Sequence, residues 1–91
     1  MKDDNFLIIP KWMIVLAYIG KNEDINTTTI SKILNVTFKH TLKMIQHLHR
    51  YKLISIVKVN GMNKINITEK GKEYAEYCYK IILLTEEDIQ I

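Results

Sequence analysis

The pair Asn60-Gly61 constrains the fold of this 91-residue chain more than any other short feature of the sequence. It lies between residues 53–59 and residues 64–68, two runs that are rich in β-branched side chains. Asparagine and glycine readily adopt the positive φ angles that a tight turn between antiparallel strands requires. The sequence therefore predicts a β-hairpin whose turn falls within residues 60–63.

Apolar residues at three- and four-residue spacing predict two helices on the outer sides of this pattern. The first begins at Pro10, because proline suits the first turn of a helix, and ends at Gly20. The other follows the hairpin over about residues 69–85, where Thr68 caps it and Glu69 complements its N-terminal dipole. These two helices frame the central part of the sequence.

Two further helices are predicted between them, only a few residues apart. Asn26 or Thr27 caps the first, which ends near Asn35, and Thr37 caps the second, which continues to Tyr51. Such a short connection forces the sharp turn of a helix-turn-helix. A hairpin directly after that unit is a wing. The expected fold is therefore mainly α with a small β-hairpin wing (α+β): a three-helix core, the wing and a C-terminal helix.

Length and composition favour one domain over residues 1–91, because 47% hydrophobic residues suffice for a single core. The lone cysteine, Cys78, excludes an internal disulfide and suggests a reducing compartment, so we expect a cytoplasmic protein. The apolar residues 6–19 follow an acidic leader and are interrupted by Pro10-Lys11. They resemble neither a signal peptide nor the roughly 20-residue apolar run of a membrane span. We therefore expect no membrane association.

The acidic residues are distributed unevenly, because residues 25–68 contain none of the ten. The same range holds seven lysines and arginines, for a formal charge of +7, and all three histidines. Glutamate would serve solvation as well as lysine does, whereas approach to a phosphate backbone requires that carboxylates be absent. The pattern favours a polyanionic partner. The acidic residues are Asp3, Asp4, Glu23, Asp24, Glu69, Glu73, Glu76, Glu86, Glu87 and Asp88.

The predicted helix from Thr37 to Tyr51 has two distinct faces at 100° per residue. The apolar face, expected in the core, contains Phe38, Thr41, Leu42, Ile45 and Leu48. The opposite face suits the major groove of duplex DNA, where Lys43 can donate to guanine and Gln46 can pair with adenine, while Thr37 reaches a phosphate. We expect base contacts from Lys39, His40, Lys43, Gln46 and His47, and a phosphate contact from Arg50.

The predicted wing carries polar residues that can contact the minor groove or its flanking phosphates. Turn chemistry alone also explains asparagine and glycine at a hairpin tip, so both interpretations stay open. The candidate residues, within 58–64, are Lys58, Asn60, Met62, Asn63 and Lys64.

A near-heptad stripe on the last helix predicts a homodimer, since one small domain does not obviously cover so many apolar side chains. Pairing of these helices would place two recognition helices about 34 Å apart on a palindromic site. A monomer with the stripe folded back is the alternative. The stripe comprises Tyr74, Tyr77, Cys78, Ile81 and Leu84.

Residues 30–54, including Asn35-Val36-Thr37 and Leu53-Ile54, resemble the helix-turn-helix of winged-helix regulators such as the MarR-like proteins. Residues 67–71, Ile-Thr-Glu-Lys-Gly, are similar to the usual exit from their wing. The resemblance implies a winged helix that binds DNA, in a chain of the length of a small archaeal or viral member. Lys52 departs from it, because glycine is common there, and the chain is too short for the additional helices of full-length repressors.

No catalytic motif is visible, and the acidic residues lie far from the basic centre, so we expect no enzyme. His47 and His49 project in different directions, and His40 lies about 10 Å along the helix from His47, so we expect neither metal nor cofactor. The sequence thus predicts a double-stranded DNA-binding protein, most simply a sequence-specific transcriptional regulator. The alternatives are an architectural nucleoid-type protein and a winged-helix module that binds another protein and no DNA.

Overall fold

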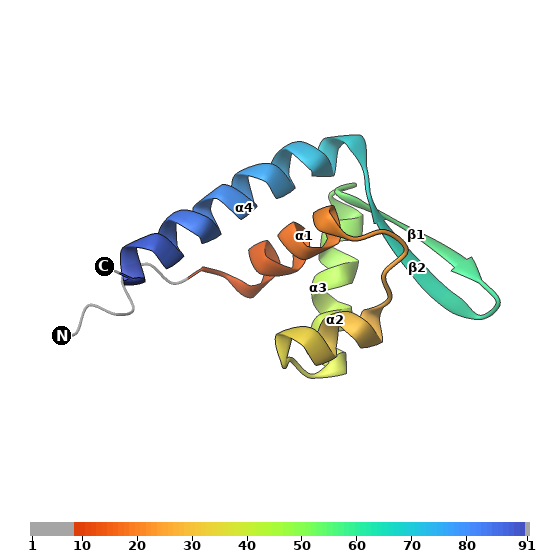
Figure 1. Ribbon diagram of the computed structural model, residues 1–91. Coiled ribbons are helices and arrows are strands. Elements are labelled where there is room, and N and C mark those ends of the chain that lie inside the picture. Colours follow the sequence, from red (N-terminus) through yellow and green to blue (C-terminus); the bar gives the residue numbers. More distant parts are fainter. Residues whose placement is uncertain (1–8, 91) are drawn as a thin grey trace.

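The computed structural model describes residues 9–90, with side chains up to residue 85, and confirms the expected order of elements. Three helices are followed by a two-stranded antiparallel hairpin and a long fourth helix (Figure 1). The elements are α1 (Lys11–Lys21), α2 (Thr27–Leu34), α3 (Phe38–Arg50), β1 (Ile54–Val59), β2 (Met62–Ile67) and α4 (Glu69–Gln90).

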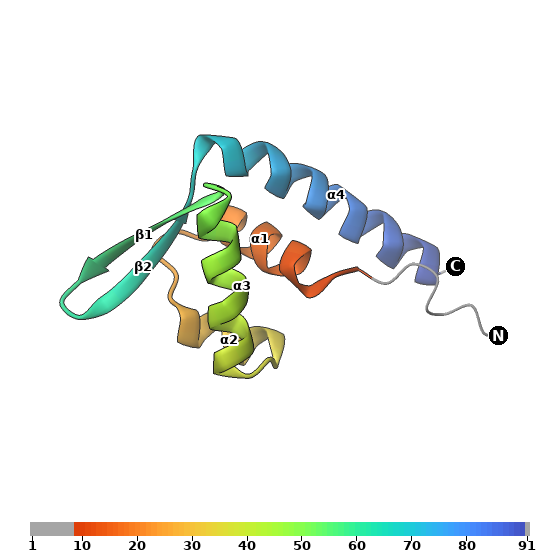
Figure 2. The same ribbon diagram turned by 180° about the vertical axis from the view of Figure 1, so that it is seen from behind.

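The helices surround one apolar core, and the hairpin projects from them. Helix α4 runs along α1, whereas α2 and α3 lie on the other side of α1 (Figure 1). Seen from behind, the hairpin extends in the direction opposite to the C-terminal end of α4 (Figure 2). Burying a large aliphatic side chain contributes about 1.5–3 kcal/mol, so this core stabilises the fold. Its fully buried aliphatic residues are Val15, Leu16, Ile19, Ile30, Ile45, Ile54 and Ile65.

Side-chain caps begin three of the helices where the sequence predicted them. Asn26 accepts a hydrogen bond from the backbone N–H of residue 29 at 2.8 Å, and Thr37 accepts one from His40 at 3.1 Å. Thr68 accepts one from the N–H of Gly71 at 2.9 Å and also donates its hydroxyl to the carbonyl of residue 52 at 2.7 Å. Each cap contributes about 1 kcal/mol. The turn between α2 and α3 uses a left-handed residue, Asn35, with φ of 54°.

The hairpin turn consists of only two residues, Asn60 and Gly61, with φ angles of 51° and 80°. These positive angles are those of a type I′ turn, as the Asn-Gly pair predicted. The second strand begins earlier than the expected residue 64, since β2 already starts at Met62. At its base the hairpin pairs with the segment before α2, because Ile25 and Ile65 exchange two backbone hydrogen bonds of 3.2 and 2.7 Å.

Two helix ends differ from the expectation. Gly20 does not end α1, which continues to Lys21. Instead it allows a close crossing, since a Cβ at this position would lie 2.9 Å from the Cβ of Ala75 in α4. Helix α4 continues beyond the expected residue 85 to Gln90. No helix in the described part of the chain is both long enough and apolar enough to cross a membrane.

Three expectations about the core also need correction. Phe38 was expected inside but is 52% exposed, because it occupies the first position of α3, where the helix has not yet reached the core. Ile33 follows the buried Ile30 at three-residue spacing, which predicts a place on the buried face of α2, yet Ile33 is 54% exposed. Met44 takes the core position on α3 that the apolar pattern did not assign, and it is buried beside Ile45 and Leu48.

Candidate nucleic-acid interface

Helix α3 is held firmly by its first turn and by one buried face. The hydroxyl of Thr41 donates to the carbonyl of Thr37 at 2.9 Å, which links the cap to the first full turn. Thr41, Met44, Ile45 and Leu48 are buried and define the side of α3 that faces the core. The opposite side is consequently free to contact a partner.

The six predicted contact residues within α3 are all exposed, and so is the cap Thr37. At 100° per residue, four of them lie within about 30° of the direction opposite the buried face and form a continuous ridge. His40 and His47 lie on one flank of this ridge. The recognition ridge consists of Lys39, Lys43, Gln46 and Arg50.

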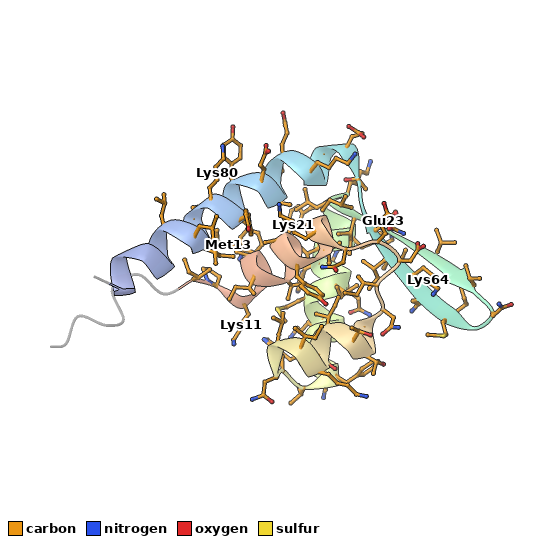
Figure 3. All side chains as sticks on the ribbon, viewed as in Figure 1. Lys11, Met13, Lys21, Glu23, Lys64 and Lys80 are labelled. Carbon is orange, nitrogen blue, oxygen red and sulfur yellow. The ribbon has the colours of Figure 1, made fainter. Side chains whose placement is uncertain are left out.

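The predicted wing residues do not all share one face. The strand register pairs Lys58 with Asn63 and Val57 with Lys64, so the two lysines of the hairpin project from opposite faces. Lys64 is half-buried on β2, and Figure 3 shows its position on the hairpin. Asn60 is one of the two turn residues, so the turn alone already accounts for an asparagine there.

The charge of this surface is uncompensated in the part of the chain that the structure describes. The only ion pair there joins Lys72 to Glu69 at 3.2 Å, at the start of α4. No cation of α3 or of the hairpin pairs with a carboxylate within residues 9–85. Asp24, at the base of the hairpin, is instead hydrogen-bonded to Asn66. The ridge thus presents unpaired positive charge to solvent.

Among the described residues, no three histidine, cysteine, aspartate or glutamate side chains come together as metal ligands.

The predicted stripe on α4 is exposed except at one residue. Tyr74, Tyr77, Ile81 and Leu84 lie within an arc of about 80° and are all exposed. Cys78 departs from the prediction: it is only 4% exposed and packs in the core of its own chain, where burial raises the pKa of its thiol. It is therefore not available on the surface of a single chain.

The exposed stripe continues into an aromatic hollow. Tyr74 lines an apolar hollow of about 320 Å³ together with Trp12 and Tyr51, which are themselves exposed. Lys70 lies at its edge and donates to the carbonyl of Tyr51 at 3.0 Å. The apolar surface of α4 therefore extends across the start of α1 and the end of α3.

Sequence reasoning missed the contacts that fix the wing relative to the helices. These contacts join residues about 40 positions apart, Asp24 with Asn66 and Ile25 with Ile65. No local sequence pattern predicts them. Sequence reasoning also missed the exposed ring of Phe38. The position of Phe38 directly after the Thr37 cap was a usable signal, because a first-turn residue often lies outside the buried face.

The fold defines a winged helix-turn-helix protein. Three helices come first, the third of them has a free basic face, and a hairpin follows it directly. A family model described as winged helix-turn-helix matches residues 10–86, and the chain belongs to this family. The predicted resemblance to winged-helix regulators is thus confirmed. A comparison with curated protein sequences found no match.

Several solved structures have a similar fold, and the matching region covers a different share of each of those chains. F-93 of SSV1 is 24% identical with a TM-score of 0.78, over 88% of this chain and 93% of F-93. Staphylococcus aureus MepR in a DNA complex is 21% identical with a TM-score of 0.80, over 96% of this chain and 67% of MepR. Streptococcus pneumoniae FabT in complex with DNA is 25% identical with a TM-score of 0.75, over 90% of this chain and 59% of FabT.

Proposed function

We propose that this chain is a sequence-specific transcriptional regulator that binds duplex DNA, with α3 in the major groove and the hairpin on the flanking backbone or minor groove. The observation that carries the proposal is the recognition ridge of Lys39, Lys43, Gln46 and Arg50, exposed along one side of a helix whose other side is buried. A helix fits the major groove, and these side chain types are donors and acceptors for base edges and phosphates.

The charge pattern supports DNA over an acidic protein as the partner. Residues 25–68 carry seven cations and no carboxylate in sequence, and the cations on α3 and the hairpin stay unpaired within the described fold. The phosphates of DNA carry negative charges at regular spacing. They can therefore interact favourably with a basic surface along its full length. MepR and FabT, similar in fold, have been solved as DNA complexes, which agrees with this assignment.

The regulator acts as a homodimer through α4. Tyr74, Tyr77, Ile81 and Leu84 form an exposed apolar stripe, and exposed apolar patches of this kind mark partner surfaces. The stripe is continuous with the aromatic hollow, so a second copy would cover both together. Two-fold pairing through α4 presents two recognition helices to one face of the duplex and implies a palindromic site.

Competition binding at one fixed salt concentration tests the function. Duplexes are first selected from a random pool with the purified protein, and the selected duplex is then competed with scrambled DNA. A sequence-specific regulator should prefer the selected duplex by about a thousandfold or more. Equal binding to all duplexes would favour the architectural alternative, and no duplex binding at low salt would favour the protein-interaction alternative.

Matched lysine variants tie the binding to the recognition ridge. Lys43→Ala removes one positive charge from the ridge, and Lys80→Ala removes one from α4, on the side away from α1 (Figure 3). The first should weaken binding to the selected duplex at least about fivefold, since a good base contact contributes about 1–3 kcal/mol. The second should have little effect. Equal losses would contradict the placement of α3 in the groove.

A further inference from the structure

Phe38 is an aromatic side chain at the start of the recognition helix that the core does not use. It is the first residue of α3, directly after the Thr37 cap and directly before Lys39 of the recognition ridge. Its ring is 52% exposed, although the apolar pattern of the helix would have buried it. A half-exposed phenylalanine gains from any partner that takes its surface out of water.

The two flanks of the recognition ridge differ in chemistry. His40 and His47 make one flank polar, whereas Phe38 and the half-buried Leu42, four residues later, lie on the other and make its N-terminal half apolar. The N-terminal half of a recognition helix usually enters the major groove deepest. An apolar side chain there meets base edges, because it has no charge with which to hold a phosphate.

The major groove presents one apolar group of its own, the C5-methyl group of thymine, and phenylalanine is among the side chains that contact it. We propose that Phe38 is a specificity-determining residue that recognises a thymine methyl group beside the bases contacted by the recognition ridge. This inference rests on the proposed function. It predicts that the preferred site contains a thymine whose methyl group, as distinct from its hydrogen-bonding edge, contributes to affinity.

The test removes the methyl group and the ring separately. Each thymine of the selected duplex is replaced in turn by deoxyuridine, which keeps the base pair and lacks only the methyl group. The wild-type chain should lose about fourfold in affinity at one or two positions, the value of one buried methyl group. Phe38→Ala should show little or no loss at those same positions. Tyr79→Ala, which removes an exposed aromatic ring on the side of α4 opposite the stripe, should keep the wild-type sensitivity.

Several outcomes would overturn the inference. They include a wild-type chain that is insensitive to every deoxyuridine, and a Phe38→Ala variant that keeps the full sensitivity. Circular dichroism melting of Phe38→Ala and of Phe38→Gln shows whether the fold is kept, and failure of both to fold would mean that the ring belongs to the core. Absence of duplex binding by the wild type would instead reject the proposed function, so the two failures are distinguishable.

Discussion

Asp24 and Asn66, which are 42 positions apart, hold each other through two hydrogen bonds at the base of the hairpin. The backbone N–H of Asp24 donates to Oδ1 of Asn66 at 2.9 Å, and Nδ2 of Asn66 donates to Oδ1 of Asp24 at 2.9 Å. Together with the backbone pairing of Ile25 and Ile65, this contact fixes the direction in which the wing leaves the helices. The contact therefore sets the orientation of the hairpin that is proposed to contact DNA.

We expect Asp24→Ala and Asp24→Asn to separate the structural role of this contact from its charge. Asp24→Ala should lower the free energy of unfolding by about 1 kcal/mol, since it removes the exposed hydrogen bond from Nδ2 of Asn66 and leaves a residue less suited to its φ of 52°. Asp24→Asn retains an acceptor and tolerates that backbone angle, so stability should change little. Its DNA affinity should rise slightly, because a carboxylate beside the wing is lost. Urea denaturation and binding titrations measure both, and equal destabilisation by the two variants would contradict this role.

Lys43→Ala and Lys64→Ala should differ in how they affect DNA binding. Loss of Lys43, on the recognition ridge, should weaken binding and change the preferred site, because the proposed function places the ridge against the bases. Loss of Lys64, on the hairpin, should weaken binding to all duplexes alike. It should also reduce the slope of log affinity against log salt concentration by about one, since about one fewer counterion is released. Titrations of several duplexes over a salt series distinguish the two. The same profile for both lysines would show that the wing and the ridge have been assigned wrongly.

Tyr77→Glu should convert the proposed dimer into a monomer. A carboxylate in the middle of the α4 stripe would have to be buried without a partner, so the dimer dissociation constant should rise at least about tenfold. Tyr79→Glu is the matched control on the opposite side of the same helix, where Lys21 lies 4.2 Å from the ring centre and can pair with the new carboxylate. Sedimentation velocity of both variants provides the measurement. Dissociation by the control alone would reject the stripe as the interface.

Lys52→Gly should stabilise the fold. Lys52 has a φ of 64°, in the left-handed region that costs a residue with a Cβ about 1 kcal/mol, and glycine avoids that cost. We expect a gain of about that size in the free energy of unfolding measured with urea. Lys52→Ala removes the same charge and keeps the strained angle, so it should show no such gain. If glycine and alanine prove equally stable, backbone strain at this position is negligible.

Gly71→Ala should be strongly destabilising. A Cβ at Gly71 would lie 1.9 Å from the carbonyl oxygen of Leu53 and 2.9 Å from Cδ1 of Ile67, so the start of α4 would have to move away from the hairpin. Overpacking typically costs about 1–3 kcal/mol, and a clash with a backbone carbonyl falls at the upper end of that range. Gly61→Ala is the contrasting variant, because nothing lies within 4 Å of its Cβ and only its positive φ is strained. Thermal melts should rank Gly71→Ala far below Gly61→Ala, and the reverse order would contradict this packing argument.

Local chemistry made much of this fold predictable from the sequence. The caps at Thr37 and Thr68 and the Asn60-Gly61 turn depend on residues within four positions of each other, so their patterns are complete in a short window. Exposure of the basic face of α3 followed from the same helical periodicity. These features define the candidate site almost without the three-dimensional structure.

What the sequence did not show depends on contacts between distant elements. Gly20 was taken as a helix end because glycine is common there, whereas its missing side chain actually lets α1 approach Ala75. Cys78 shared an apolar stripe with exposed residues, and only the crossing of α1 and α4 decided which of them faced inward. Phe38 was misplaced because periodicity does not indicate where along a helix the core begins.

The hydroxyl of Thr68 has a consequence for how a pair of these chains would span its target. It accepts from the first turn of α4 at 2.9 Å and donates to the carbonyl of Lys52, just after α3, at 2.7 Å. It therefore joins the helix proposed to enter the groove to the helix that carries the stripe. In a pair assembled through α4, the distance between the two α3 helices would then be nearly fixed. Insertion or removal of a single base pair between two half-sites would have to be absorbed by bending the DNA.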